Sequence, residues 1–138
     1  EANDLVKCIE LAELWCKITS MCGDPAFIKE ELALKKALLY FKELELEGLL
    51  LYSSVAGEVQ AFTIFSKLND DTADIHFEKS NIEIHGASQI INWETAKYLA
   101  NRYKFLNREQ DLGILGLRQA KKSYAPEFVY RSYILKRK

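Results

Sequence analysis

The chain has 138 residues, of which 49% are hydrophobic and 28% charged, and this balance excludes an intrinsically disordered protein. Its length suits one domain, or half of a larger one, with a core that needs no metal or disulfide. No apolar run approaches the roughly 18 residues of a membrane-spanning helix. The net charge is only −1, yet residues 101–138 carry ten basic and three acidic side chains, which indicates either an anion-binding surface or a solvated basic face.

Two amphipathic helices are predicted in the N-terminal third. Apolar residues at three- and four-residue spacing indicate the first helix over residues 4–19. Asp24 and Pro25 suit the N-cap and the first position of the second helix, because a carboxylate accepts backbone N–H bonds and proline lacks an N–H that would have no partner there. This helix is expected to run to about residue 46 and to end at Gly48.

The three cysteines, Cys8, Cys16 and Cys22, show neither a C-x-x-C motif nor the spacing of zinc ligands, and no metal site is expected. Because the number of cysteines is odd and their spacing suits neither a redox motif nor zinc, we expect free thiols in a reducing cytoplasm. Cys8 and Cys16 lie on the apolar stripe of the first helix, so they are expected to be small core residues.

Strands and helices are predicted to alternate in the rest of the chain. Residues 49–55 and 58–66 are typical of a hairpin around Ala56-Gly57, and residues 72–78 of a third strand. Further elements are expected in this order: a helix over residues 89–102, a strand over 103–107, a helix over 114–123 and a final strand over 127–135. The order ααβββαβαβ predicts an α+β or α/β domain with a mixed sheet.

The third strand has an unusually ionisable face. Its residues alternate strictly between the two faces of the sheet. The apolar face is expected to hold Ala73, Ile75 and Phe77, and the ionisable face Asp74, His76 and Glu78. Glu78 or His76 would then take a proton from an amine or hydroxyl nucleophile. The other interpretation is the solvated face of a half-buried antiparallel strand.

The turn Gly86-Ala87-Ser88-Gln89 leads into the third helix. A helix N-terminus offers unpaired N–H groups and partial positive charge, so it binds phosphate readily. Gly86 would let the backbone approach a ligand closely. The other interpretation is that Ser88 only caps the helix.

Residues 107–124 form a further candidate site. Arg108 and Asp111 flank a loop, and Arg118 and Lys121 are three residues apart, so they share one face of the next helix. Such a face would clamp a phosphate or carboxylate, with the arginine bidentate and the lysine as a point charge. It would otherwise be a surface helix with internal salt bridges.

This segment resembles the signature N-R-E-x-D-L-G-x-x-G-L-R-x-A-K-x-S-Y-x-P of an uncharacterised bacterial family related to the C-terminal domain of phosphatidylglycerol lysyltransferase. The pattern is met by Asn107, Arg108, Glu109, Asp111, Leu112, Gly113, Gly116, Leu117, Arg118, Ala120, Lys121, Ser123, Tyr124 and Pro126. Other stretches are similar to the same family: Trp15-Cys16, residues 59–63, residues 76–79 and Gly86-Ala87.

The family resembles GCN5-related N-acetyltransferases in fold, often with two such units in tandem. The resemblance implies an acyl-CoA N-acyltransferase-like fold, with a mixed, mostly antiparallel sheet flanked by helices and without the first strand of such a unit. Residues 1–138 would be a single domain, the C-terminal half of a longer tandem protein. Its partner would be an N-terminal acetyltransferase-like half.

The resemblance also implies a place for the donor and a base. The phosphates of the acyl donor would lie at Gly86, Ala87, Ser88 and Gln89, and Glu78 on the preceding strand would be the base. The donor would be acetyl-CoA or another acyl-CoA, or an aminoacyl-tRNA, for which the basic C-terminal segment is suited. The acceptor would be a lipid head group or a peptide. The Gln/Arg-x-x-Gly-x-Gly/Ala loop common in coenzyme A-dependent relatives is absent from the sequence.

Three functions follow. The first is an acyl- or aminoacyltransferase, in which Arg118 and Lys121 or backbone N–H groups stabilise the oxyanion, and Arg108 and Asp111 position the substrate or hold the loop. The second is an acetyl-CoA-dependent N-acetyltransferase. The third is a non-catalytic half of a tandem protein, in which residues 107–126 are a structural motif.

Overall fold

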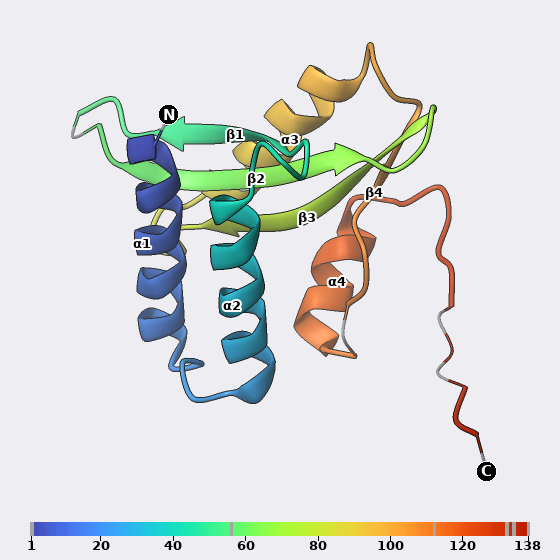
Figure 1. Ribbon diagram of the computed structural model, residues 1–138, viewed down its shortest axis with the longest axis horizontal. Coiled ribbons are helices and arrows are strands. Elements are labelled where there is room, and N and C mark those ends of the chain that lie inside the picture. Colours follow the sequence, from blue (N-terminus) through green and yellow to red (C-terminus); the bar gives the residue numbers. More distant parts are fainter. Residues whose placement is uncertain (1, 56, 112, 132, 134, 138) are drawn as a thin grey trace. The chain divides into compact units, whose positions relative to one another are not determined.

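The computed structural model describes residues 2–55, 57–111, 113–131, 133 and 135–137 (Figure 1). The chain divides into two compact units, residues 1–107 and residues 108–138. The first unit contains α1 (Ala2–Thr19), α2 (Pro25–Leu39), β1 (Glu47–Tyr52), β2 (Val59–Lys67), β3 (Thr72–Ser80), α3 (Ala87–Leu99) and β4 (Phe105–Asn107). The second unit contains α4 (Leu115–Ser123).

The first unit is a four-stranded sheet with helices on both faces. The strands are ordered β1-β2-β3-β4; the first two pairings are antiparallel, and β3 and β4 are parallel. Figure 1 shows α1 and α2 against one face of this sheet and α3 against the other. The expected α+β class and the mixed, mostly antiparallel sheet are therefore confirmed.

The final strand expected over residues 127–135 has no counterpart in the described part of that range. Residues 132 and 134 of this stretch, Ala56 of the expected hairpin turn and Leu112 of the C-terminal motif lie outside the described residues. The hairpin itself is present, because β1 and β2 pair in antiparallel register.

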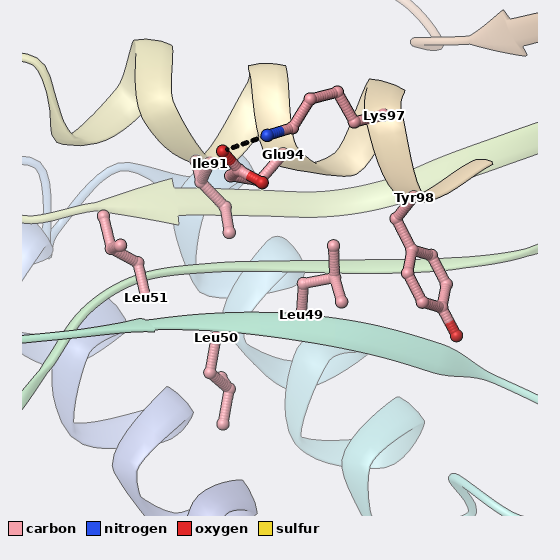
Figure 2. Close-up of a pocket in the computed structure, with 7 residues that line it drawn as sticks. All are labelled: Leu49, Leu50, Leu51, Ile91, Glu94, Lys97 and Tyr98. Carbon is pink, nitrogen blue, oxygen red and sulfur yellow. Dashed lines mark ion pairs between the residues drawn. The ribbon is translucent and has the colours of Figure 1, made fainter. Parts of the chain in front are cut away.

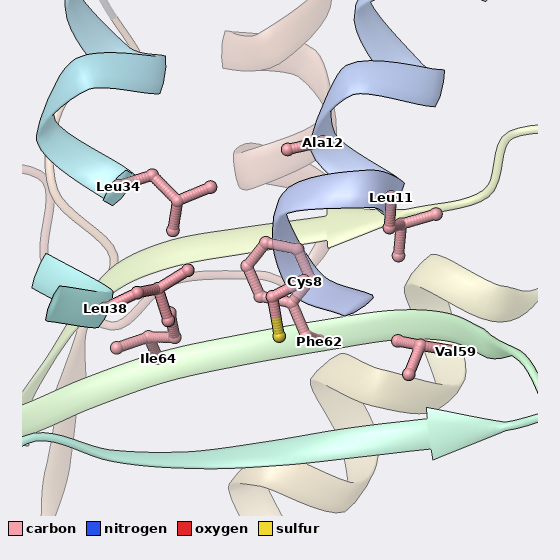
Figure 3. Close-up of a cluster of buried hydrophobic side chains, with 8 residues drawn as sticks. All are labelled: Cys8, Leu11, Ala12, Leu34, Leu38, Val59, Phe62 and Ile64. Carbon is pink, nitrogen blue, oxygen red and sulfur yellow. The ribbon is translucent and has the colours of Figure 1, made fainter. Parts of the chain in front are cut away.

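Strand β2 supplies the centre of the core on both faces of the sheet. Toward α1 and α2, Phe62 and Ile64 pack with Cys8, Leu11 and Leu34 (Figure 3). Toward α3, a second cluster contains Phe65, Ala73, Ile75 and Leu99. Successive residues of β2 thus contribute to the cores on opposite faces of the sheet, as the two-residue period of a strand requires.

Helix α2 starts as expected and ends earlier. The Asp24 carboxylate accepts the N–H of Ala26 at 2.8 Å, and Pro25 occupies the first helical position. The helix ends at Leu39, and residues 40–45 form turns before β1 begins at Glu47. The expected stop at Gly48 is wrong. Gly48 lies in β1, where an added Cβ would be 2.7 Å from the carbonyl oxygen of Thr63, so the glycine allows close pairing with β2.

A β-bulge in β3 changes the expected alternation. Ile64 pairs with Phe77 and Phe65 pairs with Ile75, which leaves His76 as the extra residue. Beyond the bulge the faces exchange: Ile75 packs in the cluster beside α3, whereas Phe77 packs in the cluster beneath α1 and α2. The prediction that these two residues share a face is therefore wrong.

Lys79 ties β3 to the two N-terminal helices. Its ammonium lies 2.8 Å from the Glu30 carboxylate, 4.2 Å from the centroid of the Trp15 ring and 5.4 Å from that of Phe27. Only 11% of the Lys79 side chain is exposed. The two rings stack with centroids 5.1 Å apart. This contact between three elements has no short-range signal in the sequence.

The cysteines differ in part from expectation. Cys8 is buried in the core, as predicted, and burial raises the pKa of its thiol to about 12. Cys16 and Cys22 are joined as a disulfide, with their Cα atoms 5.0 Å apart, so the expectation of free thiols is wrong for this pair. The short loop after α1 brings the two residues together.

Candidate functional site

The bulge separates the ionisable residues of β3. Beyond it, the Glu78 carboxylate accepts a hydrogen bond from the side-chain amide of Asn92 on α3, at 3.4 Å. Before it, Asp74 pairs with Ser66, which alternates with Phe62 and Ile64 toward the opposite face. The shared face predicted for Asp74, His76 and Glu78 is therefore wrong for Glu78. Its role as a base stays a prediction.

His76 lies on the same face as Asp74. Its Nε2 is 2.8 Å from the Ser66 hydroxyl oxygen, and its Nδ1 is 3.8 Å from Asp74 Oδ2. The two side chains are 29% and 14% exposed. Asp74 Oδ1 is buried without a hydrogen-bond partner among the described residues. The sequence indicated His76 and Asp74, but nothing in it indicated Ser66.

The start of α3 presents backbone N–H groups, as the turn predicted. Gly86 is the N-cap, with φ at 86°, a left-handed conformation that glycine adopts without strain. Ser88 is inside the helix and makes no capping bond, so the interpretation of Ser88 as the cap is wrong. The N–H of Ala87 is bonded to Ile84, and that of Ile90 to Gly86. The N–H groups of Ser88 and Gln89 have no hydrogen-bond partner within the described residues, because the first turn of a helix offers them none.

The edge of β3 leads toward this helix start. Strand β4 pairs with β3 only along Thr72–Asp74, and β3 continues to Ser80, shortly before Gly86. Within the described part of the first unit, residues 75–80 therefore have no neighbouring strand on the β4 side.

The basic motif in the second unit is held together by its own contacts. The Asp111 carboxylate binds Arg118 through Nε at 2.5 Å and Nη2 at 3.2 Å, and it accepts the N–H of Gly113 at 2.9 Å. Mainly the Arg118 guanidinium, and to a smaller extent the backbone N–H of Gly113, lowers the pKa of Asp111 to about 2. These contacts hold the loop before α4 against the N-terminal part of that helix.

Lys121 and Arg108 also make contacts within the motif. The Lys121 ammonium donates to the carbonyl oxygens of Arg108 and Gln110, the latter at 2.7 Å. The Arg108 guanidinium lies 4.8 Å from the centroid of the Tyr124 ring. On the predicted helix face, Arg118 and Lys121 therefore bind the loop over residues 108–111. The third function, in which residues 107–126 are a structural motif, expects this arrangement. Their proposed anion contacts stay a prediction.

An apolar groove lies at the other edge of the sheet, between β1 and α3 (Figure 2). Its volume is about 460 Å³. Leu49 and Leu51 point toward α3, where Ile91 and Tyr98 complete the lining. A pair of charges, Glu94 and Lys97, lies 2.8 Å apart on its rim. The charged residues of the lining, Glu94 and Lys97, are paired with each other, and the leucines and Ile91 are apolar, so the groove is suited to packing.

The sequence matches the family model "Phosphatidylglycerol lysyltransferase, C-terminal" over residues 1–136. A crystal structure of a conserved protein of unknown function from Bacteroides thetaiotaomicron VPI-5482 is 37% identical, with a TM-score of 0.86. The match covers 94% of this chain and 43% of that one, so the chain spans less than half of this relative's length.

Two acetyltransferase structures are similar in fold. The ribosomal-protein-alanine N-acetyltransferase from Brucella melitensis biovar Abortus 2308 has a TM-score of 0.66 at 14% identity, over 100% of this chain and 95% of that one. An acetyltransferase from Trypanosoma brucei has a TM-score of 0.61 at 10% identity, over 99% and 94% of the two chains. These structures confirm the predicted acetyltransferase-like fold.

No curated protein matches the sequence. Among the described residues, none of the helices combines the length and the apolar character that crossing a membrane would require.

Proposed function

Because the chain belongs to the family of phosphatidylglycerol lysyltransferase C-terminal domains, we propose that it is a transferase domain that moves an aminoacyl or acyl group onto an amine or hydroxyl acceptor. The acceptor would be a lipid head group or a peptide. One observation carries the proposal: within the described part of the first unit, β3 continues beyond its pairing with β4 toward the N-terminal turn of α3. The family match and the acetyltransferase-like fold support it.

The donor would be held by its phosphates at the start of α3. Both candidate donors, an acyl-CoA and an aminoacyl-tRNA, combine phosphate groups with an activated acyl group. The N–H groups of Ser88 and Gln89 and the partial positive charge of the helix would bind the phosphates. The acyl arm would then extend along residues 75–80 of β3, beyond the part of this strand that pairs with β4.

Glu78 is the proton acceptor that this geometry favours. Its carboxylate lies on the α3 face of the sheet, in contact with Asn92. There it would remove a proton from the attacking amine or hydroxyl as the acyl group is transferred. His76, the other candidate base, lies on the opposite face, because the bulge exchanges the faces between these two residues.

Replacing Glu78 by glutamine tests this role. The variant Glu78→Gln keeps the size and the contact to Asn92 but removes the base, so turnover should fall by about 10²-fold or more at a nearly unchanged unfolding temperature. Glu94→Gln makes the same chemical change on the rim of the groove and should leave turnover as it is. Equal losses of turnover and of stability in Glu78→Gln would contradict the proposed role.

The two donors can be distinguished by binding. A rise of several degrees in unfolding temperature with acetyl-CoA would favour the N-acetyltransferase, because a ligand that binds the folded state stabilises it. Retention of charged but not uncharged tRNA in a mobility-shift assay, weaker at higher salt, would favour aminoacyl transfer. Binding of neither donor would favour the third function, a non-catalytic half of a tandem protein. The ion pair between Asp111 and Arg118 within the motif supports this structural alternative.

We also propose that the edge of β1 receives a strand from an acetyltransferase-like partner half. β1 is the edge of the sheet, and its Leu49, Leu50 and Leu51 are all partly exposed. An apolar edge of this kind pairs readily with another strand. In the chain by itself we therefore expect self-association through β1, measured by sedimentation. Leu51→Lys should suppress it, and the same association in the variant would contradict this use of the edge.

A further inference from the structure

Ser66, His76 and Asp74 form a cluster that the proposed transfer does not use. Ser66 on β2 and Asp74 on β3 are directly paired, and His76 is the extra residue of the bulge. Ser66 alternates with Phe62 and Ile64 and so lies on the face of the sheet opposite α3, as does its partner Asp74. His76 reaches Ser66 on this same face. A bulge commonly re-aims a side chain, and here it directs His76 back toward the two paired residues.

The contacts of His76 set the chemistry of the cluster. Its Nδ1 faces the Asp74 carboxylate at 3.8 Å, and its Nε2 is 2.8 Å from the Ser66 hydroxyl oxygen. A carboxylate beside Nδ1 favours the tautomer with the proton on that nitrogen. The lone pair of Nε2 is then available to accept the hydrogen bond of the Ser66 hydroxyl, which is the arrangement that activates a serine for attack.

The burial of the Asp74 carboxylate is unusual for an aspartate with only a structural role. Its side chain is 14% exposed, and its Oδ1 is buried without a hydrogen-bond partner in the described part of the chain. A buried polar atom without a partner costs free energy, so it requires an explanation. A carboxylate at this position would orient the imidazole and stabilise the imidazolium that forms during catalysis.

We propose that Ser66 is a nucleophile that accepts an acyl group from an activated ester or thioester. Ser66 Oγ attacks the acyl carbonyl carbon, while His76 Nε2 takes the hydroxyl proton. The bond to the leaving group breaks, and the alkoxide or thiolate takes this proton from His76. Water then attacks the carbonyl carbon of the acyl-serine and gives a proton to His76 Nε2. The bond between this carbon and Ser66 Oγ breaks, Oγ takes the proton back from His76, and the carboxylic acid leaves. The distance between His76 and Asp74 is longer than a hydrogen bond, and such contacts commonly shorten when substrate binds.

The test uses the whole chain and p-nitrophenyl acetate. We expect a rapid release of about one equivalent of p-nitrophenolate per chain, and peptide mapping should place one acetyl group on Ser66. Ser66→Ala should abolish both signals. Ser80→Ala, which changes a serine at the far end of β3, should retain them. A wild-type chain without acetyl-Ser66, or one that releases p-nitrophenolate as Ser66→Ala does, would overturn the proposal.

The histidine and the aspartate are tested with Ser66 in place. His76→Asn should slow the acetylation of Ser66 by about 10²-fold or more, and an unchanged rate in a folded variant would overturn the proposal. Asp74 is a positioning residue: Asp74→Asn should slow the acetylation, and Asp74→Glu should restore part of it. Circular dichroism checks that each variant is folded. The assay needs neither a phosphate-bearing donor nor an acceptor, so its result is independent of the function proposed above.

Discussion

Truncation of Lys79 should destabilise the first unit, because this side chain joins β3 to both N-terminal helices. Lys79→Ala removes three methylene groups from a side chain that is only 11% exposed, at about 0.8 kcal/mol each. It also removes the ammonium 4.2 Å from the Trp15 centroid, a contact worth about 1–2 kcal/mol when desolvated. The side-chain entropy regained on truncation offsets about 1.5 kcal/mol. We therefore expect a net loss of about 2 kcal/mol.

Urea unfolding followed by tryptophan fluorescence measures this loss. The control is Lys97→Ala, which breaks an ion pair to Glu94 with both side chains about half exposed, and it should cost less than about 0.5 kcal/mol. The carboxylate of Glu30, 40% exposed, can be solvated after the truncation, so it adds little to the loss. If Lys79→Ala and Lys97→Ala unfold at the same urea concentration, the account of this contact is refuted.

Three further predictions rest on single contacts. Gly48→Ala should destabilise the sheet by about 1–3 kcal/mol in a urea titration, because its Cβ would lie 2.7 Å from the Thr63 carbonyl oxygen; a neutral result would contradict the close pairing. The pKa of Asp111 is lowered to about 2, so its contact with Arg118 should be complete above pH 4 and be lost as the pH falls toward 2. In a carboxyl NMR titration, Arg118→Gln should bring the pKa of Asp111 back toward 3.8. An unchanged pKa in this variant would contradict the pairing. Burial raises the pKa of Cys8 to about 12, so iodoacetamide should label it at pH 8 only on unfolding, and fast labelling of the native chain would be contrary evidence.

Local patterns predicted the elements of the first unit, because each depends on neighbouring residues. Asp24 and Pro25 marked the start of α2, and the two-residue period marked β3. Their ends were less well predicted, since α2 ends at Leu39 and Gly48 belongs to β1. The need for a glycine there comes from the neighbouring strand, at Thr63, and not from the local sequence.

The candidate site was predicted where its geometry is local. The helix start after Gly86 was indicated by the turn, whereas the left-handed conformation of Gly86 was not predicted. The faces of β3 were not, because the bulge at His76 arises from the register between β2 and β3. Ser66 became a candidate only through this register, since nothing in its own neighbourhood distinguishes it from other serines in strands.

The binding site of the acyl donor decides the central claim, and a pair of charge variants locates it. Gln89→Glu places a negative charge in the first turn of α3, where it stabilises the helix but repels phosphate. Gln119→Glu places the same charge on α4, beside Arg118. We expect acetyl-CoA, or charged tRNA in a parallel titration, to bind Gln89→Glu several-fold more weakly than the wild type and Gln119→Glu about as well, with the difference largest at low salt. Unchanged binding in Gln89→Glu together with weakened binding in Gln119→Glu would place the donor on the basic motif and contradict the proposed site.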